Sequence, residues 1–330
     1  MSNSKEKAIG LDIGTSRIVT ARQAGESYDF QAQLNAFVTI PYSKMTEGVL
    51  KKENVPYTVE GPEIVVFGNE SARFADLMNH ETRRPMTRGV LNPNEPESLS
   101  QIRQIVSSML KPEGKGQTVC FSVPAAPLGA EENLTYHEVS LRGMLAELGY
   151  EVKSVNEGMA VVYSELADSN YTGIGVSCGG GLCNVAVSYM SIPVLSFSIP
   201  KGGDFVDSSA ASATGELANR IRITKEDAFH FNGHYPTKVH QALSVYYDDM
   251  MKAIIQGLRD AFQSGKSAPR LGRAVPLVLS GGSTLPAGFR DRFEKLFQEA
   301  SLPLEISEIR LASEPLYTTA RGALVASLSE

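Results

Sequence analysis

The chain has 330 residues, of which 42% are hydrophobic and 21% are charged. This length suits two α/β domains of roughly 100–200 residues each better than a single core, and the composition excludes a disordered chain. The net charge of −6 excludes a general attraction to nucleic acid, because the phosphate backbone binds basic surfaces.

Features that bear on location point to a cytoplasmic protein. No window approaches about 18 uninterrupted apolar residues, so we expect no membrane-spanning helix. Residues 1–7 lack the apolar core of a signal peptide and the apolar face of an interfacial helix. Cys120, Cys178 and Cys183 lie in apolar or glycine-rich runs without zinc-site spacing, which favours buried reduced thiols. We therefore expect no membrane anchor of its own.

The predicted elements fall into two similar sets. Apolar runs and turn residues predict strands at 8–13, 18–21, 65–68, 118–123, 174–176, 185–189, 193–198 and 275–279. Helical spacing of apolar residues predicts helices at 98–110, 136–148, 208–222, 246–262, 289–300 and 320–328. The order strand, glycine turn, strand occurs at 8–21 and again at 173–189. Two hairpins of one design favour two domains of one design, although two ordinary hairpins could coincide.

The first candidate site is the turn after the first strand. Asp12 ends a buried strand, where a carboxylate is costly unless a cation meets it. Gly14 lets the backbone approach a ligand closely, and Thr15, Ser16 and Arg17 offer the donors that a phosphate accepts from. This segment predicts a phosphate-binding turn in which Asp12 faces Mg²⁺ through water. Taken alone, it is equally consistent with a hairpin turn that Asp12 caps.

Two more glycine-rich strand ends follow. The run Gly179–Gly181 comes after the strand at 174–176 and gives room for a phosphate chain, but a glycine-rich hairpin without a ligand is at least as common. The run Gly281–Ser283 follows the strand at 275–279. Its glycines let the backbone lie flat against a purine or ribose, or Ser283 caps a strand-to-helix turn.

Together, the three strand ends carry a resemblance that none carries alone. In order and spacing they resemble the phosphate 1, phosphate 2 and adenosine signatures of the actin/DnaK-chaperone/sugar-kinase ATPase superfamily. Within it the chain is most similar to bacterial actin-like filament proteins of the MreB and MamK kind. The likeness spans residues 8–328 and is also carried by the segments 84–91, 121–125, 155–160, 202–207 and 314–323.

The resemblance implies an α/β actin-like ATPase fold. It has two duplicated RNase H-like domains flanking a nucleotide cleft, each with a small inserted subdomain. We expect the first domain at 1–155, with its insertion at about 32–80. We expect the second domain at 156–330, with its insertion at about 206–274.

The resemblance also implies a chemistry with ATP or ADP and Mg²⁺. Glu157 would position the water that attacks the terminal phosphate, and Asp12 would orient a water of the Mg²⁺ shell. Glu157 could instead complement a helix dipole. The nucleotide-binding candidates are Gly14, Thr15, Ser16, Arg17, Ser177, Gly179, Gly180, Gly181, Gly202, Gly203, Asp204, Lys225, Glu226, Gly281, Gly282 and Ser283.

The sequence departs from the family pattern in two places. Ser177 and Asn184 stand where the second phosphate signature carries aspartates, which would weaken Mg²⁺–nucleotide binding or turnover by roughly 10- to 100-fold. Lys225 and Glu226 lie in a segment, 224–229, that we interpret as an exposed charged helix start. The apolar residues of the loop 32–80 could form core or a subunit contact.

The leading interpretation is an ATP-binding cytoskeletal protein that hydrolyses ATP slowly and assembles with itself into head-to-tail filaments, with an adaptor protein as a possible partner. A non-polymerising accessory protein with weakened ATPase activity is the alternative, and a small-molecule kinase is a third class. The sequence does not decide whether the bound nucleotide is ATP or GTP.

Overall fold

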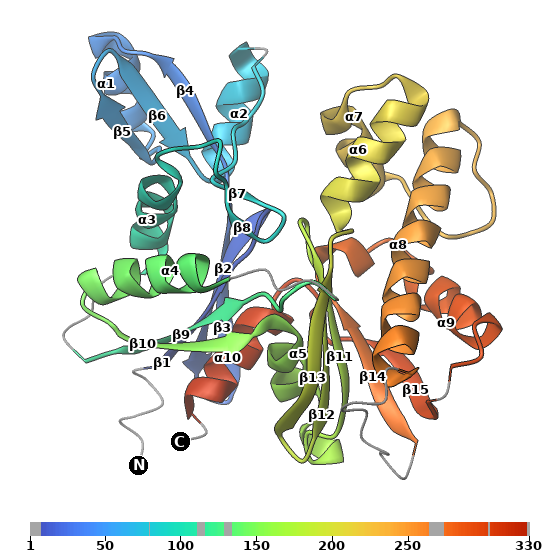
Figure 1. The fold of residues 1–330 in the computed structure, drawn as a ribbon. Helices are drawn as coiled ribbons and strands as arrows, with labels where there is room; N and C mark the ends of the chain where they lie inside the picture. The colour runs from blue at the N-terminus through green and yellow to red at the C-terminus, as the bar shows by residue number, and fades with distance from the viewer. Residues whose placement is uncertain are drawn as a thin grey trace.

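The computed structural model describes residues 8–78, 80–110, 116–128, 134–263, 274–302 and 304–328. Two five-stranded sheets stand side by side with helices around them, and a three-stranded sheet lies at one end of the first half (Figure 1).

The first sheet has the strand order β10-β9-β1-β2-β3. β1, β2 and β3 form an antiparallel meander, and β9 and β10 continue the sheet in parallel from β1. The elements of this half are β1 (Ala8–Ile13), β2 (Arg17–Ala24), β3 (Ser27–Leu34), β4 (Phe37–Pro41), α1 (Lys44–Lys52), β5 (Tyr57–Glu60), β6 (Glu63–Phe67), α2 (Asn69–Met78), β7 (Met86–Thr87), β8 (Val90–Leu91), α3 (Ser98–Met109), β9 (Thr118–Val123), α4 (Thr135–Glu147), β10 (Glu151–Asn156) and α5 (Glu157–Glu165).

The second sheet has the order β13-β12-β11-β14-β15, which is the same topology. β11, β12 and β13 form the meander, and β14 and β15 continue it in parallel. The duplication predicted from the two hairpins is therefore confirmed. The elements here are a short 3₁₀ turn (Ala167–Ser169), β11 (Gly173–Cys178), β12 (Cys183–Tyr189), β13 (Ile192–Ile199), α6 (Gly203–Thr214), α7 (Ala218–Asp227), α8 (Lys238–Gln263), β14 (Val275–Ser280), a second 3₁₀ turn (Gly282–Thr284), α9 (Phe289–Glu299), β15 (Ile306–Leu311) and α10 (Thr318–Leu328).

The segment between β3 and β7 forms the three-stranded sheet β4-β6-β5 with α1 and α2. Its apolar residues Phe37, Val38, Ile40, Leu50 and Val55 are all buried. Four of them join one local core, and Phe37 packs into the core of the large sheet. These residues therefore build the core of the fold, which answers the question that the sequence left open for them.

One predicted helix is wrong. The segment 208–222 is two helices, α6 and α7, because α6 ends at Gly215 in the left-handed conformation (φ 75°). A left-handed glycine is the commonest way to stop a helix. α8 also begins at Lys238, earlier than the predicted start at 246.

Two helices connect the halves. α5 follows the first sheet but packs on β11 and β12 of the second, while α10 follows the second sheet but packs on β1 and β2 of the first. They cross between the two sheets (Figure 1). Side chains at Gly10 or Gly322 would overlap the backbone of Ala320 or Ala160, respectively. The halves are thus joined by direct backbone packing.

Two further expectations concern the cysteines and membrane-spanning helices. Cys120, Cys178 and Cys183 are buried and not disulfide-bonded, as the sequence predicts. Within the described ranges, no helix combines the length and hydropathy needed to cross a bilayer.

Candidate functional site

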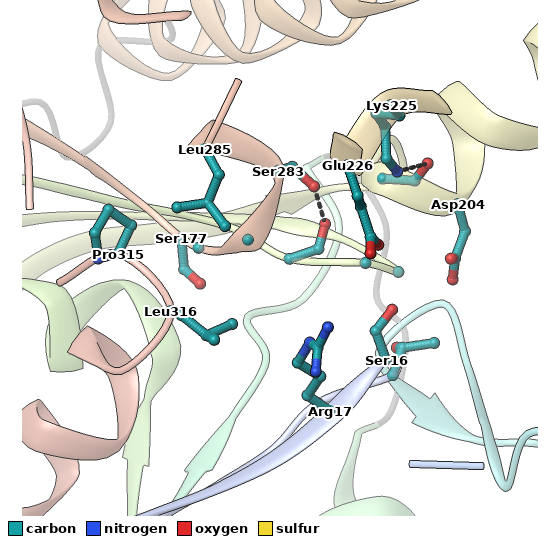
Figure 2. A pocket seen from close by; sticks show the side chains of 18 of the residues that line it. Ser16, Arg17, Ser177, Asp204, Lys225, Glu226, Ser283, Leu285, Pro315 and Leu316 are labelled. Atoms are coloured by element: carbon teal, nitrogen blue, oxygen red, sulfur yellow. Dashed lines mark hydrogen bonds between the residues drawn. The ribbon is translucent and has the colours of Figure 1, made fainter. Parts of the chain in front are cut away.

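The β1–β2 turn is held rigidly by the first half. A hydrogen bond from the N–H of Gly14 to the carbonyl of Arg17 (2.9 Å) closes it. The fully buried Asn35 donates from Nδ2 to the Gly14 carbonyl (2.9 Å). Thr15 is buried and accepts at Oγ1 from the N–H of Gly89 (2.9 Å). These bonds leave the Arg17 side chain pointing from the start of β2 into the space between the halves (Figure 2).

The β11–β12 turn repeats this design. The N–H of Gly179 donates to the carbonyl of Leu182 (2.9 Å), in the same place as the closing bond of the first turn. A Cβ at Gly180 would overlap Ser16 Oγ, and one at Gly181 would lie 2.5 Å from Thr15 Oγ1. These glycines are therefore needed because the first turn crosses them. Side chains of the first turn lie against Gly180 and Gly181 on this side, and both glycines also line the cleft.

The start of α6 rests on the second turn. The N–H groups of Gly203 and Asp204 donate to the carbonyls of Gly179 (3.0 Å) and Gly180 (2.8 Å). A Cβ at Gly202 would overlap the Gly180 carbonyl. The backbone at 202–204 is thus fixed to the second turn, and the Asp204 side chain is turned toward the first half (Figure 2).

The end of β14 completes this wall. Gly281 has a φ of +94°, and a Cβ there would overlap the Cys178 carbonyl, so only glycine fits. Ser283 Oγ donates to the Gly179 carbonyl (2.9 Å) (Figure 2). Ser283 therefore ties the third strand end to the second turn. A Cβ at Gly282 would make only an ordinary van der Waals contact with Leu316, at 3.8 Å.

Two carboxylates lie on the floor between the halves. Ser122 Oγ donates to Asp12 Oδ1 (2.6 Å), and Asn184 Nδ2 donates to Glu157 Oε2 (2.8 Å). Asn184 is buried, and its Oδ1 accepts from the N–H of Ala125 (2.8 Å). Because both ends of the amide are engaged, its orientation is fixed with the donor toward Glu157.

The charges of these carboxylates are not offset. Burial raises the pKa of Asp12 to about 6 against the hydrogen bond from Ser122. Burial, and then the charge of Asp12, raise the pKa of Glu157 to about 8 although Asn184 and Ser177 donate to it. Among the described residues no Lys or Arg contributes to either shift. A cation placed between them would therefore be stabilised.

Lys225 differs from the interpretation made from sequence. It lies in the last turn of α7 and not in an exposed helix start, and the residue is only 8% exposed. Its ammonium forms an ion pair with Asp207 (2.8 Å) and lies 3.4 Å from the Gly203 carbonyl. Glu226, the next residue, is exposed. The expected helix start is therefore wrong for both residues, which lie at the end of α7, and the expected exposure is wrong for Lys225 and right for Glu226.

The parts described above enclose a cleft of about 350 Å³, which is in the usual range for small-molecule sites. All the sequence-predicted site residues line it except Gly202. They are Asp12, Gly14, Thr15, Ser16, Arg17, Glu157, Ser177, Gly179, Gly180, Gly181, Gly203, Asp204, Lys225, Glu226, Gly281, Gly282 and Ser283. The fold thus brings together residues that lie up to 271 positions apart, from Asp12 to Ser283.

A family model named Volactin matches residues 7–327. The chain belongs to the Volactin family. Solved structures show the same fold. The "MamK double helical filament" has a TM-score of 0.74 and 19% identity over 98% of this chain and 99% of that one. MreB5 of Spiroplasma citri bound to ADP has a TM-score of 0.68 and 16% identity, with 96% and 94% covered.

A third structure is the ethanolamine utilization protein EutJ from Carboxydothermus hydrogenoformans, with a TM-score of 0.56 and 16% identity over 96% of this chain and 88% of that one. No curated protein sequence matches this chain. At these identities the likeness concerns the fold. It confirms the expected actin-like α/β fold and the resemblance to the MreB and MamK kind.

The cleft of this Volactin-family chain also contains residues that sequence reasoning missed. Leu285, Pro315 and Leu316 supply an apolar side to it (Figure 2). Pro315 and Leu316 lie in the segment 314–323, whose likeness to the family could have identified them as site residues. No sequence signal pointed to the buried Tyr247, which reaches the cleft from the long helix α8.

Proposed function

We propose that this Volactin-family protein binds ATP or ADP, with Mg²⁺, in the cleft between its halves. The observation that carries the proposal is Arg17. Its guanidinium points into the cleft and has no hydrogen bond or ion pair with any described residue. A guanidinium has five donors and no acceptor, so it favours an anion that accepts two bonds at once. A nucleotide phosphate at the paired glycine turns meets that need.

Mg²⁺ fits the same place by charge. Asp12 and Glu157 are two carboxylates without a cationic partner, and a divalent ion would offset both. In the described ranges no three His, Cys, Asp or Glu side chains converge as metal ligands. The ion would therefore keep several waters and take phosphate oxygens, as Mg²⁺ commonly does, with Asp12 facing one of the waters.

Slow hydrolysis is the second part of the proposal. When bound, Mg²⁺ supplies the positive charge that stabilises a phosphoryl group as it is transferred. Glu157 positions the attacking water and accepts its proton, and Asn184 holds the carboxylate in one orientation. In the ligand-free protein, burial and Asp12 raise the pKa of Glu157 to about 8, and bound Mg²⁺ would lower it again. The low rate is supported by Ser177 and Asn184, which bring no charge where the family signature carries aspartates.

Assembly is the third part. The two ends of the molecule differ, since one carries the three-stranded sheet, α6 and α7 and the other carries the lower ends of the two large sheets (Figure 1). A contact between unlike ends repeats without closing when the rotation does not complete a ring. The MamK structure with the same fold is a double helical filament. We propose that ATP favours a closed, assembly-competent state of a cytoplasmic protein.

Electron microscopy and pelleting of the purified protein with MgATP and with MgADP test the proposal. We expect filaments with MgATP and fewer with MgADP. Monomers with every nucleotide would refute assembly and leave nucleotide binding to be judged by calorimetry.

A non-polymerising accessory protein is the second candidate. Ser177 and Asn184 favour it, because neither brings the negative charge of the usual second phosphate signature. Tight binding of ATP in calorimetry, without phosphate release over hours and without filaments, would establish this alternative.

A further inference from the structure

An ion pair joins the two halves above the glycine turns. Arg84, just before β7, donates from Nη1 to Asp204 Oδ1 (2.7 Å) in the first turn of α6. The two side chains are 23% and 37% exposed. A pair with this exposure is worth little by itself, because water and salt screen it. It is therefore a contact that a stronger partner can replace.

The same guanidinium reaches the first phosphate turn. Arg84 Nη1 lies 3.5 Å from Ser16 Oγ, and the two turns meet at Ser16 and Gly180. The other donors of Arg84, at Nε and Nη2, have no partner among the described residues. Arg84 thus stands beside the place where both turns meet, with donors to spare.

Two cavities meet at this ion pair. Asp204 lines the cleft and also a second cavity of about 530 Å³, which lies between α2 and the helices α6 and α7. Arg84 lines only the second cavity. The ion pair therefore lies where the second cavity adjoins the cleft, beside Ser16 of the first turn.

We propose that Arg84 recognises the last phosphate of a nucleoside triphosphate by exchanging the Asp204 carboxylate for it. The inference rests on the proposed nucleotide site. A phosphate carries more charge than a carboxylate and can accept two parallel bonds from the guanidinium fork. A nucleoside diphosphate lacks that group and leaves Arg84 on Asp204. Arg84 is then a specificity residue for triphosphate over diphosphate, and the exchange occurs between the two halves.

Calorimetric titration with Mg·AMPPNP and with Mg·ADP tests this. Arg84→Ala should weaken AMPPNP binding about 10- to 100-fold, the value of a lost charge-assisted bond, and should change ADP binding less than threefold. Arg84→Lys, which keeps the charge but loses the fork, should recover part of the loss. Asp204→Asn should tighten AMPPNP up to about fivefold, because the competing partner is gone.

Arg83→Ala is the matched control. Arg83 is the neighbouring arginine, pairs with Glu95 and lines neither cavity, so both affinities should stay within twofold of wild type. If Arg84→Ala and Arg84→Lys both leave the ratio of the two affinities at its wild-type value, the inference is overturned while the proposed site stands. If wild-type protein binds neither nucleotide, the proposed site and the inference fall together.

Discussion

The crossing of α5 and α10 makes one substitution especially informative. Gly322 lies inside α10, and a Cβ built on it would be 1.8 Å from the carbonyl oxygen of Ala160 in α5. Gly322→Ala therefore forces the two backbones apart by more than 1 Å. Both helices are wedged between the sheets, so neither can move without loosening the clusters around it.

The free-energy change follows from two opposing terms. Alanine inside a helix is favoured over glycine by about 1 kcal/mol. Overpacking typically costs about 1–3 kcal/mol, and a gap of 0.5–1 Å forfeits a quarter to a half of each contact beside it. Since the obstacle is backbone that cannot rotate away, we expect a cost at or above the top of that range, about 3–5 kcal/mol. After the gain of about 1 kcal/mol, Gly322→Ala should lower the free energy of unfolding by about 2–4 kcal/mol.

Gly143→Ala is the matched control, because Gly143 lies inside α4 and a Cβ there meets nothing within 4 Å. It should raise the free energy of unfolding by about 0.5–1 kcal/mol. Denaturant unfolding followed by circular dichroism measures both variants. If Gly322→Ala were as stable as wild type, or gained as much as Gly143→Ala, the close α5–α10 contact would be disproved.

Four further predictions concern the charged groups. Arg17→Ala should weaken MgATP binding about 10- to 100-fold, measured by calorimetry. Its free energy of unfolding, measured with denaturant, should stay within about 0.5 kcal/mol of wild type. A loss of stability as large as the loss of binding free energy would contradict the prediction. Glu157 has a pKa raised from 4.5 to about 8 by burial and then by Asp12, so its protonated form stabilises the fold below pH 4.5 and this stability is lost as pH rises to 8. Ligand-free Glu157→Gln should therefore lose less stability than wild type between pH 5 and pH 8.5. If the unfolding free energies of the two proteins ran parallel over this pH range, the raised pKa of Glu157 would be refuted. Burial lowers the pKa of His137 from 6.5 to about 4, so stability present above pH 6.5 is lost as pH falls toward 4, and His137→Gln should flatten that decline by up to about 1.4 kcal/mol per pH unit in the same assay. Asn184→Asp replaces the donor to Glu157 by a second anion, so phosphate release should slow about 10-fold or more, and a faster variant would contradict the role of the amide.

Much of the fold could be predicted from the sequence because its buried strands are continuous apolar runs. The strand at 118–123 has the predicted bounds, and the two hairpins at 8–21 and 173–189 appear in equivalent places of two equivalent sheets. Local signals suffice there because an apolar run bounded by turn residues has few other structures open to it. The site could also be anticipated, since each glycine turn directly follows such a strand.

What could not be predicted depends on residues far apart in the chain. Nothing near Lys225 indicates that it will be buried, because its partner Asp207 comes from another helix. Gly180 and Gly181 looked like room for a ligand, yet their small size is needed by a turn more than 160 residues earlier. The Arg84–Asp204 pair joins residues 120 positions apart. Tertiary packing alone creates these contacts: the Lys225–Asp207 pair forms within the second half, and the other contacts form between the two halves.

The neutral residues Ser177 and Asn184, which flank the second turn in β11 and β12, change how the site is understood. Read from sequence, Ser177 and Asn184 are lost aspartates and predict a weaker site. In the structure both donate to Glu157, which aspartates could not do while ionised. Two more carboxylates here would join Asp12 and Glu157 in a region where no described cation offsets either charge, and would raise the pKa of Glu157 further. The substitution therefore removes negative charge that Mg²⁺ could have used, and in return it supplies the donors that hold Glu157 in place. These donors are consistent with the proposed slow turnover of a bound nucleotide, and binding and hydrolysis must therefore be measured separately.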